Sequence, residues 1–359
     1  MSDRNLVVTG PGKPEIVEEP RAPGPFRVRT LFSGVSAGTE LSFVKGTNPA
    51  LHERFDPALG LFRAGDAPDP YPVTRLGYME VGRVERSDTP AVAEGEVVAM
   101  TYGHRTGWTG DPLRDRVVPL PAGLDPILGI YVAHMGPICA NGLLHAAADL
   151  YGPGARRLGD GVEGRRVAVV GAGVVGLLTA LFARAHHAAS VVVIDPTPQR
   201  RSIAEALGLE ALDPDADDIA VTLKTTWRHT ADDRGADVVF QCRGQASALH
   251  LALRLLRPQG TVIDLAFYQG GADEVRLGAE FHHNGLTVRC AQIGRVPRGL
   301  GATWDRERLS AETVRLLHRD GDAIRRHLIT AVVPFDDGPA LLTDLADRRR
   351  QEVQAVLAF

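Results

Sequence analysis

Short apolar runs separated by helical segments recur through the second half of the chain. They cover residues 167–170, 191–194, 238–241, 262–266 and 286–292. The first of these runs, just before Gly171, has the length and the apolar composition of a strand buried on both faces. Because strands and helices alternate regularly, the pattern predicts an α/β fold built on a doubly wound parallel sheet.

The first 120 or so residues have a different pattern, with short strand candidates at 28–32, 82–86 and 96–100 between glycines and prolines. They predict a β-rich domain. Residues 48–72 contain five prolines and little periodicity. This segment is predicted to be a long surface loop, serving either as a lid or binding loop or as a tolerated insertion.

Residues 127–148 are mostly apolar and predict one or two helices, interrupted at Gly136-Pro137, before a connecting loop at 151–164. Near the end, a helix over 311–318 with Ser310 as its cap, a strand at 329–335, a helix from Gly338 and a last strand at 353–359 are expected. We therefore predict domains at 1–125 and 126–294, with a tail at 295–359.

Three glycines follow the first strand of the predicted sheet: Gly171, Gly173 and Gly176. In a strand–turn–helix context they allow a tight turn, a close approach to a pyrophosphate and close packing of helix on strand, and Val174 and Val175 open the phosphate-facing helix. The motif predicts a Rossmann dinucleotide site. The alternative is a glycine-rich turn of another α/β protein.

Asp195 ends the next predicted strand, where a carboxylate can accept hydrogen bonds from the adenosine ribose of NAD. A 2′-phosphate at about 4 Å from it would be repelled by about 4 kcal/mol at an effective dielectric of about 20. NAD is therefore favoured over NADP, although Arg200 and Arg201 follow closely and could offset the repulsion.

Composition narrows the class of protein. A chain of 359 residues predicts two domains, and 44% apolar with 23% charged residues is typical of a globular protein. The net charge of −4 gives no reason to expect nucleic acid or an anionic membrane as a partner. With no signal-peptide pattern and no membrane-length apolar run, a cytoplasmic location is expected. Three cysteines are widely spaced, so they predict no disulfide framework and no local metal knuckle.

Five ordered motifs resemble the medium-chain dehydrogenase/reductase superfamily. They lie at residues 33–40, 76–84, 171–176, 235–244 and 256–262. The resemblance implies a GroES-like catalytic domain, a Rossmann domain, a tail returning to the first domain, and a homodimer joined through residues 286–292. It also implies a small alcohol or ketone as substrate.

The motifs depart from the zinc enzymes of that superfamily at each ligand position. Ser36-Ala37 stands where a ligand cysteine is usual, Tyr78 stands where a histidine is usual, and the four-cysteine structural zinc lobe is missing. Cys139 lies near a third ligand position but out of register. One thiolate cannot hold a zinc ion that needs three protein ligands, so no zinc is predicted. The closest resemblance is to the zinc-less branch similar to bacteriochlorophyllide a dehydrogenase.

Without a metal, hydrogen-bond donors must stabilise the developing alkoxide. The resemblance makes Thr39 the first candidate for a proton relay, with a helix cap as its alternative. Tyr78 could donate to the alkoxide or fill the space of the metal. Glu40 is expected to pair with a buried basic group, or to act as a helix-start charge. His104 could relay protons, although a surface turn is the favoured interpretation.

Further candidates come from the predicted cleft. Ser36, His134 and Asn141 are candidate substrate-binding residues, with a buried structural histidine as the alternative for His134; His145 is a weaker candidate. His282 and His283 are expected to point to opposite sides of a strand. Cofactor contacts are expected at the ends of two strands: Cys242, Arg243, Ala266 and Phe267.

Three functions follow from these features. The leading one is a zinc-independent NAD-dependent oxidoreductase that interconverts a secondary alcohol and a ketone. The second is a zinc-less NAD(P)H-dependent enone or quinone reductase. The third is a non-catalytic dinucleotide-binding sensor or scaffold.

Overall fold

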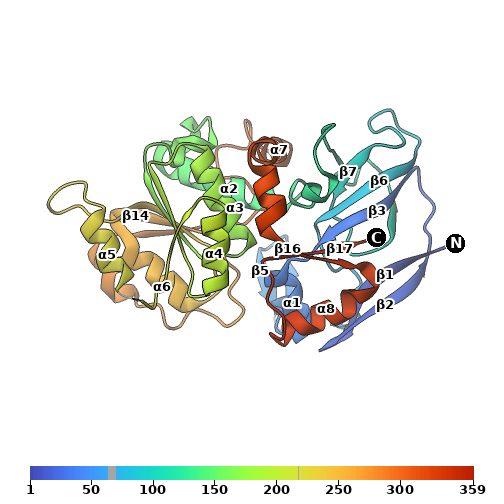
Figure 1. Ribbon diagram of the computed structural model, residues 1–359, viewed down its shortest axis with the longest axis horizontal. Coiled ribbons are helices and arrows are strands. Elements are labelled where there is room, and N and C mark those ends of the chain that lie inside the picture. Colours follow the sequence, from blue (N-terminus) through green and yellow to red (C-terminus); the bar gives the residue numbers. More distant parts are fainter. Residues whose placement is uncertain (64–69, 217) are drawn as a thin grey trace. The chain divides into compact units, whose positions relative to one another are not determined.

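The computed structural model describes residues 1–63, 70–216 and 218–359. The chain forms two compact units, Met1–His134 with Ile329–Phe359, and Met135–Leu328. The boundaries differ from the predicted ones, because residues 295–328 lie with the second unit and not with the rest of the tail. The α/β class, with a parallel sheet in one unit and a β-rich sheet in the other, is confirmed (Figure 1).

The first unit is built on a seven-stranded sheet in the order β16-β17-β3-β6-β7-β9, with β8 also paired to β3. Its strands are β3 (Phe26–Gly34), β6 (Glu80–Ser87), β7 (Val97–Met100), β8 (Gly107–Gly110), β9 (Val118–Pro119), β16 (Ile329–Pro334) and β17 (Gln354–Ala358). The tail returns to this unit, since Val356 of β17 lies opposite Gly34 of β3. Helices α1 (Ala37–Lys45) and α8 (Gly338–Ala346) pack against each other beside it, over a core of aliphatic side chains.

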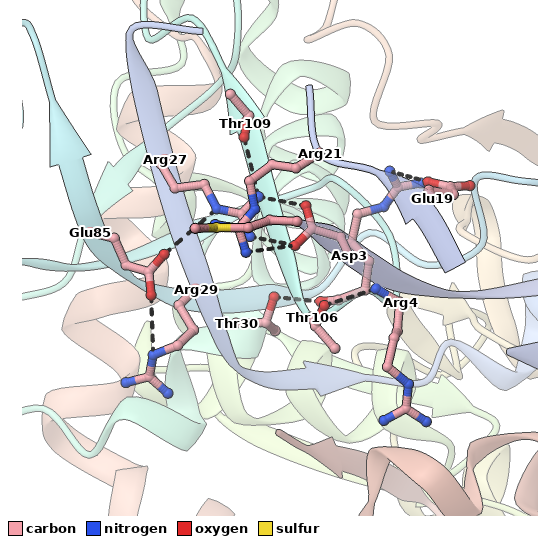
Figure 2. A network of polar contacts seen from close by, with 12 residues as sticks. Asp3, Arg4, Glu19, Arg21, Arg27, Arg29, Thr30, Glu85, Thr106 and Thr109 are labelled. Carbon is pink, nitrogen blue, oxygen red and sulfur yellow. Dashed lines mark hydrogen bonds and ion pairs between the residues drawn. The ribbon is translucent and has the colours of Figure 1, made fainter. Parts of the chain in front are cut away.

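A hairpin of β1 (Ser2–Gly10) and β2 (Lys13–Pro20) was not predicted, and it completes this unit. Figure 2 shows the ion-pair network that holds it. Arg27 of β3 makes a bidentate contact with Asp3 of β1, with Nη1–Oδ2 at 2.7 Å and Nη2–Oδ1 at 2.5 Å. Both side chains are largely buried, so the hairpin is anchored by a charge pair shielded from water.

The proline-rich segment is not a structureless loop. It contains a short hairpin of β4 (Arg54–Asp56) and β5 (Leu61–Arg63), in which Phe55 faces Phe62 at a ring-centroid distance of 5.1 Å. Residues 64–69, which belong to the same predicted loop, lie outside the described residues. Cross-strand aromatic pairing stabilises these two short strands, which the proline-rich sequence did not indicate.

The second unit has a six-stranded, wholly parallel sheet in the order β12-β11-β10-β13-β14-β15. Its strands are β10 (Arg166–Val170), β11 (Ser190–Ile194), β12 (Glu210–Leu212), β13 (Ala236–Gln241), β14 (Leu256–Asp264) and β15 (Thr287–Cys290). Its helices are α2 (Met135–Tyr151), α3 (Val174–Ala185), α4 (Pro198–Ala206), α5 (Ile219–Thr226), α6 (Ala246–Leu255) and α7 (Arg306–Ala323). The predicted strands are confirmed: β10, β11, β13 and β14 are largely buried, whereas β15 is an exposed edge strand.

Three helix predictions were wrong in detail. The break in the apolar segment lies between a 3₁₀ turn at Pro126–Tyr131 and α2, so Gly136-Pro137 falls in the first turn of α2, where proline is tolerated. Helix α7 starts earlier than predicted and is capped by Asp305, which accepts from Arg308 N–H at 2.8 Å, while Ser310 is buried inside it. His282 and His283 lie in a helical turn and not a strand.

Among the described residues, every helix is too short or too polar to cross a bilayer.

Candidate functional site

Strand pairing brings two hydroxyl groups of the first unit together. The end of β3 lies antiparallel to the start of β6, with Ser33 opposite Glu80. Ser36 follows β3 at the start of α1, and Tyr78 precedes β6. As a result, Ser36 Oγ and Tyr78 Oη form a hydrogen bond, between a buried hydroxyl and a half-buried phenol. His134 packs edge-on against the Tyr78 ring at a centroid distance of 4.7 Å.

Behind this pair lies a buried polar chain of four side chains. Glu40 Oε2 lies 2.8 Å from His104 Nε2, and Glu40 Oε1 accepts the Ser36 N–H at 2.8 Å. On its other side, His104 Nδ1 lies 2.5 Å from Ser33 Oγ, which in turn donates to Glu80 Oε1 at 3.0 Å. Glu40 therefore has the buried basic partner expected of it, and the two residues come from elements far apart in sequence.

The ionisation of this chain follows from burial and from mutual charge. Burial would lower the pKa of His104, but the charge and hydrogen bond of Glu40, with the charge of Glu80, outweigh it and raise that pKa. Burial raises the pKa of the Glu80 carboxyl, against the opposing effects of His104 and of several hydrogen bonds. Both shifts favour retention of protons inside the cluster.

His104 is fully buried, so its interpretation as a surface turn was wrong. It reaches the hydroxyl pair through Glu40 and by packing under Gly77, where an added Cβ would lie 2.7 Å from the imidazole. Thr39 lies in the first turn of α1 and is half-buried, while Ser36 occupies the cap position. The cap alternative for Thr39 is therefore also wrong.

The second unit contains a cradle at the end of β10 that suits a pyrophosphate. Gly171 has φ of +106°, which favours glycine. A Cβ on Gly176 would lie 1.8 Å from the Gly171 carbonyl oxygen, so only glycine lets α3 start this close to the strand. Nothing lies within 4 Å of a Cβ built on Gly173. Val174 and Val175 open α3, so its free N–H groups face this open space.

Asp195 directly follows β11, as predicted, but its carboxylate is buried and turned toward backbone. Oδ2 accepts the Ala172 N–H and Oδ1 the Thr197 N–H, each at 2.8 Å. Arg200 Nη1 lies 3.9 Å from Oδ2, and more than a third of the Arg200 side chain is exposed. The carboxylate predicted to meet the ribose is therefore hydrogen-bonded to the backbone and has a guanidinium next to it.

A cavity of about 330 Å³ opens beside these residues at the carboxyl ends of β10, β11 and β13. It is lined by Val170, Ile194, Arg243, Ser247, His250 and Arg254, among others. Its position at the strand ends is the usual place for a nucleotide in a doubly wound sheet. Of these residues only Arg243 was predicted as a cofactor contact. Val170 and Ile194 end strands β10 and β11, and Ser247, His250 and Arg254 lie on α6 and carry no local motif.

A second polar group, missed by the sequence analysis, fixes the loop after β14. Gln241 Nε2 donates to Tyr268 Oη at 3.1 Å, and that hydroxyl donates to Asp264 Oδ2 at 3.0 Å. Burial raises the pKa of Asp264. Ala266 N–H donates to Asp264 Oδ1 at 2.9 Å, and Phe267 is exposed. The group therefore orients the stretch in which cofactor contacts were predicted.

Other predicted site residues have structural surroundings in the second unit. The buried Asn141 amide donates to the carbonyls of Ala291, Gln292 and Arg295. Cys242, next to the glycine cradle, has a pKa raised by burial. Burial and the charge of Arg289 lower the pKa of His145 to about 4.

The donor chemistry does not fit a zinc centre. Ser36 and Tyr78 hydrogen-bond to each other, and the Cys139 thiol is buried against the carbonyls of Met135 and Val175. Across residues 1–63, 70–216 and 218–359, no group of three or more His, Cys, Asp or Glu side chains could hold a metal ion. We derive no step through a metal.

Comparison with known proteins identifies the family. Residues 174–304 match the sequence family described as zinc-binding dehydrogenase. The chain is 28% identical to D-guloside 3-dehydrogenase of Escherichia coli, over 97% of each chain. These matches confirm the predicted resemblance to the medium-chain dehydrogenase/reductase superfamily. L-galactonate-5-dehydrogenase of Escherichia coli is 33% identical over 46% of this medium-chain dehydrogenase and 48% of its own length.

Solved structures agree with the fold of this medium-chain dehydrogenase. L-idonate 5-dehydrogenase of Escherichia coli superimposes with a TM-score of 0.70 at 18% identity, over 100% of this chain and 99% of its own. A protein of Sinorhizobium meliloti 1021 described as a zinc-binding dehydrogenase, bound to NADP, gives 0.73 at 20% identity, over 100% of both chains. At these identities the likeness concerns the fold. The prediction of a dehydrogenase with a Rossmann and a GroES-like domain is confirmed.

Proposed function

We propose that this medium-chain dehydrogenase interconverts a secondary alcohol and a ketone with NAD and without a catalytic metal. The observation that carries the proposal is the hydrogen-bonded pair of Ser36 and Tyr78, at the positions where zinc ligands stand in related enzymes. Two hydroxyls can donate to a developing alkoxide and pass its proton on.

The reaction balances with these groups. NAD held at the glycine cradle of Gly171, Gly173 and Gly176 would supply the acceptor for the hydride of the carbinol carbon, which carries two electrons and one proton. The remaining hydroxyl proton leaves through Tyr78 and Ser36 to water, with Thr39 as the next hydroxyl along α1. In the reverse direction the same hydroxyls protonate the alkoxide.

A polyol or glycoside is the substrate class that we favour. Two relatives are named for dehydrogenation of a guloside and of a galactonate, and a solved structure of the same fold is an idonate dehydrogenase. For the cofactor we keep NAD, because the Asp195 carboxylate stays beside the ribose position and repels a 2′-phosphate. The neighbouring Arg200 weakens that repulsion, so NADP is a second, poorer cofactor.

The test is a substrate panel of glycosides, polyols, sugar acids and enones, assayed with both cofactors by absorbance at 340 nm. We expect alcohol oxidation with NAD that resists chelator treatment and metal removal. Replacing Tyr78 by Phe should lower kcat about a hundredfold, within the range of a lost general acid–base group, while Tyr151→Phe, at an exposed site, serves as the matched control. Turnover of enones alone would favour the reductase alternative, and tight NADH binding without turnover the sensor alternative.

The assembly that we propose is a homodimer joined edge to edge. β15 ends the six-stranded sheet, and Thr287, Val288 and Cys290 on it are exposed. Exposed edge strands pair readily with another chain. Light scattering on the purified protein tests this, and a monomer at micromolar concentration would refute it.

A further inference from the structure

The buried chain Glu40–His104–Ser33–Glu80 has more acceptors than donors unless it holds an additional proton. Its members are almost completely buried, with Ser33, Glu80 and His104 at 0% exposure and Glu40 at 1%. Inside a protein, each unpaired polar atom of such a chain costs free energy. Its hydrogen positions can therefore be worked out from its contacts.

The Ser33 hydroxyl has one hydrogen and two neighbours. If it donates to Glu80 Oε1, as the geometry indicates, His104 must donate to Ser33 from Nδ1. On the opposite side, Glu40 is held by the Ser36 N–H and requires a second donor, which is Nε2–H of His104. Both ring nitrogens then carry hydrogen, which makes the ring an imidazolium.

The alternative arrangement places the extra proton on Glu80, with Ser33 donating to a neutral His104. The Met79 N–H opposes it, because this group already donates to the same Glu80 oxygen at 3.1 Å. A protonated carboxyl oxygen is a poor acceptor for that N–H, and a proton on the other oxygen, the buried Glu80 Oε2, would find no hydrogen-bond partner among the described residues. The charged groups that act on His104 are Glu40 from α1 and Glu80 from β6, and both favour the imidazolium.

The imidazolium contacts both segments that carry the hydroxyl pair. Through Glu40 it fixes the backbone N–H of Ser36, and by packing under Gly77 it fixes the residue before Tyr78. Gly77 has φ of +98°, so its close approach to the ring also depends on glycine. One charged ring thus sets the relative position of Ser36 and Tyr78.

We propose that His104 is a positioning residue: a buried imidazolium, held between Glu40 and Glu80, that keeps the Ser36 and Tyr78 hydroxyls in contact for proton transfer. This role rests on the proposed alcohol–ketone function of the same site. Because His104 is fully buried, it cannot touch substrate. Its protonated ring therefore acts by holding other groups in place.

The direct test needs no variant and no turnover. In protein labelled with ¹⁵N-histidine, imidazolium and neutral rings have distinct nitrogen shifts. At pH 8, about 1.5 units above the ordinary histidine pKa, we expect one of the twelve rings to remain doubly protonated. Glu80→Gln keeps the shape of the side chain and should turn that ring neutral. Twelve neutral rings at pH 8 would overturn the proposal.

The second test separates positioning from stability. Glu80→Gln should lower kcat between about tenfold and a hundredfold, as small misplacements of reacting groups do, with an unchanged KM for the cofactor. Glu94→Gln, at an exposed position of the same unit, is the control and should match the wild type. If Glu80→Gln turns the ring neutral and the variant still has the wild-type kcat, the positioning role is refuted. Absence of any turnover in the wild type refutes the proposed function, while the nitrogen spectrum still decides the protonation state.

Discussion

Replacing Gly173 by alanine tests the cofactor cradle without disturbing the protein around it. Nothing lies within 4 Å of the added Cβ, whereas the same change at Gly176 would bring Cβ within 1.8 Å of a carbonyl oxygen. Gly173 has φ of −81° and ψ of −177°, which alanine adopts without strain. Alanine is a poorer helix cap than glycine, which lowers the free energy of unfolding by about 0.5 kcal/mol. Alanine also reduces the conformational entropy of the unfolded chain, which raises the free energy of unfolding by a similar amount. We therefore expect a melting temperature within about 2 °C of the wild type.

The methyl group of the variant occupies the space through which a pyrophosphate approaches the start of α3. Overpacking of a tight contact costs about 1–3 kcal/mol, which corresponds to a Kd for NADH about 5 to 150 times higher. Calorimetric titration with NADH measures the Kd, and circular dichroism measures the melting curve. Gly154→Ala, another glycine of the same unit with no neighbour within 4 Å, is the control. Wild-type affinity in Gly173→Ala would refute the assignment of the cradle, and a large fall in melting temperature would refute the claim of open space.

Three further changes test other parts of the structure. Asp3→Ala leaves the buried Arg27 without its bidentate partner (Figure 2) and should reduce the free energy of unfolding by about 3 kcal/mol; a loss below about 1 kcal/mol in urea denaturation would contradict this. Because the folded pKa of His104 is raised, its contribution to stability is complete below the unfolded value of about 6.5 and is lost as pH rises through the folded value. The urea midpoint of the wild type should therefore fall between pH 7 and 9 more than that of His104→Gln, and parallel curves would count against the shift. Arg200→Ala removes the guanidinium 3.9 Å from Asp195 and should lower the ratio of NADP to NAD efficiency about tenfold, equal to about 1.4 kcal/mol; an unchanged ratio in steady-state assays would show that Arg200 does not meet the 2′-phosphate.

The parallel sheet was predictable because its signals are local. The central strands β10, β11 and β13 each contain a continuous apolar run, and the glycine motif encodes its own turn, close approach and helix start within six residues. The same reasoning failed where contacts between distant segments decide the structure. The hairpin of β1 and β2 is held by Asp3 and Arg27, and the helix cap at Asp305 precedes the apolar periodicity that defines α7.

The candidate site was predictable in part, for a related reason. The substitutions at Ser36 and Tyr78 could be read from motif positions, but their mutual hydrogen bond depends on the register of β3 against β6. His104 looked like a surface residue because glycine and polar residues surround it in sequence. Its partners Glu40 and Glu80 lie on other elements, so no local pattern could indicate its burial.

A hydroxyl pair and a metal ion place different demands on the protein around them. A bound divalent cation stabilises an alkoxide through its charge, which acts over several ångströms. Hydroxyl donors act only at hydrogen-bond distance and near linear geometry, so a shift of about 1 Å removes most of their effect. A site that relies on Ser36 and Tyr78 therefore needs a rigid support, and a buried chain of hydrogen-bonded charged groups provides one. Substitutions in that support should change kcat more than they change substrate affinity.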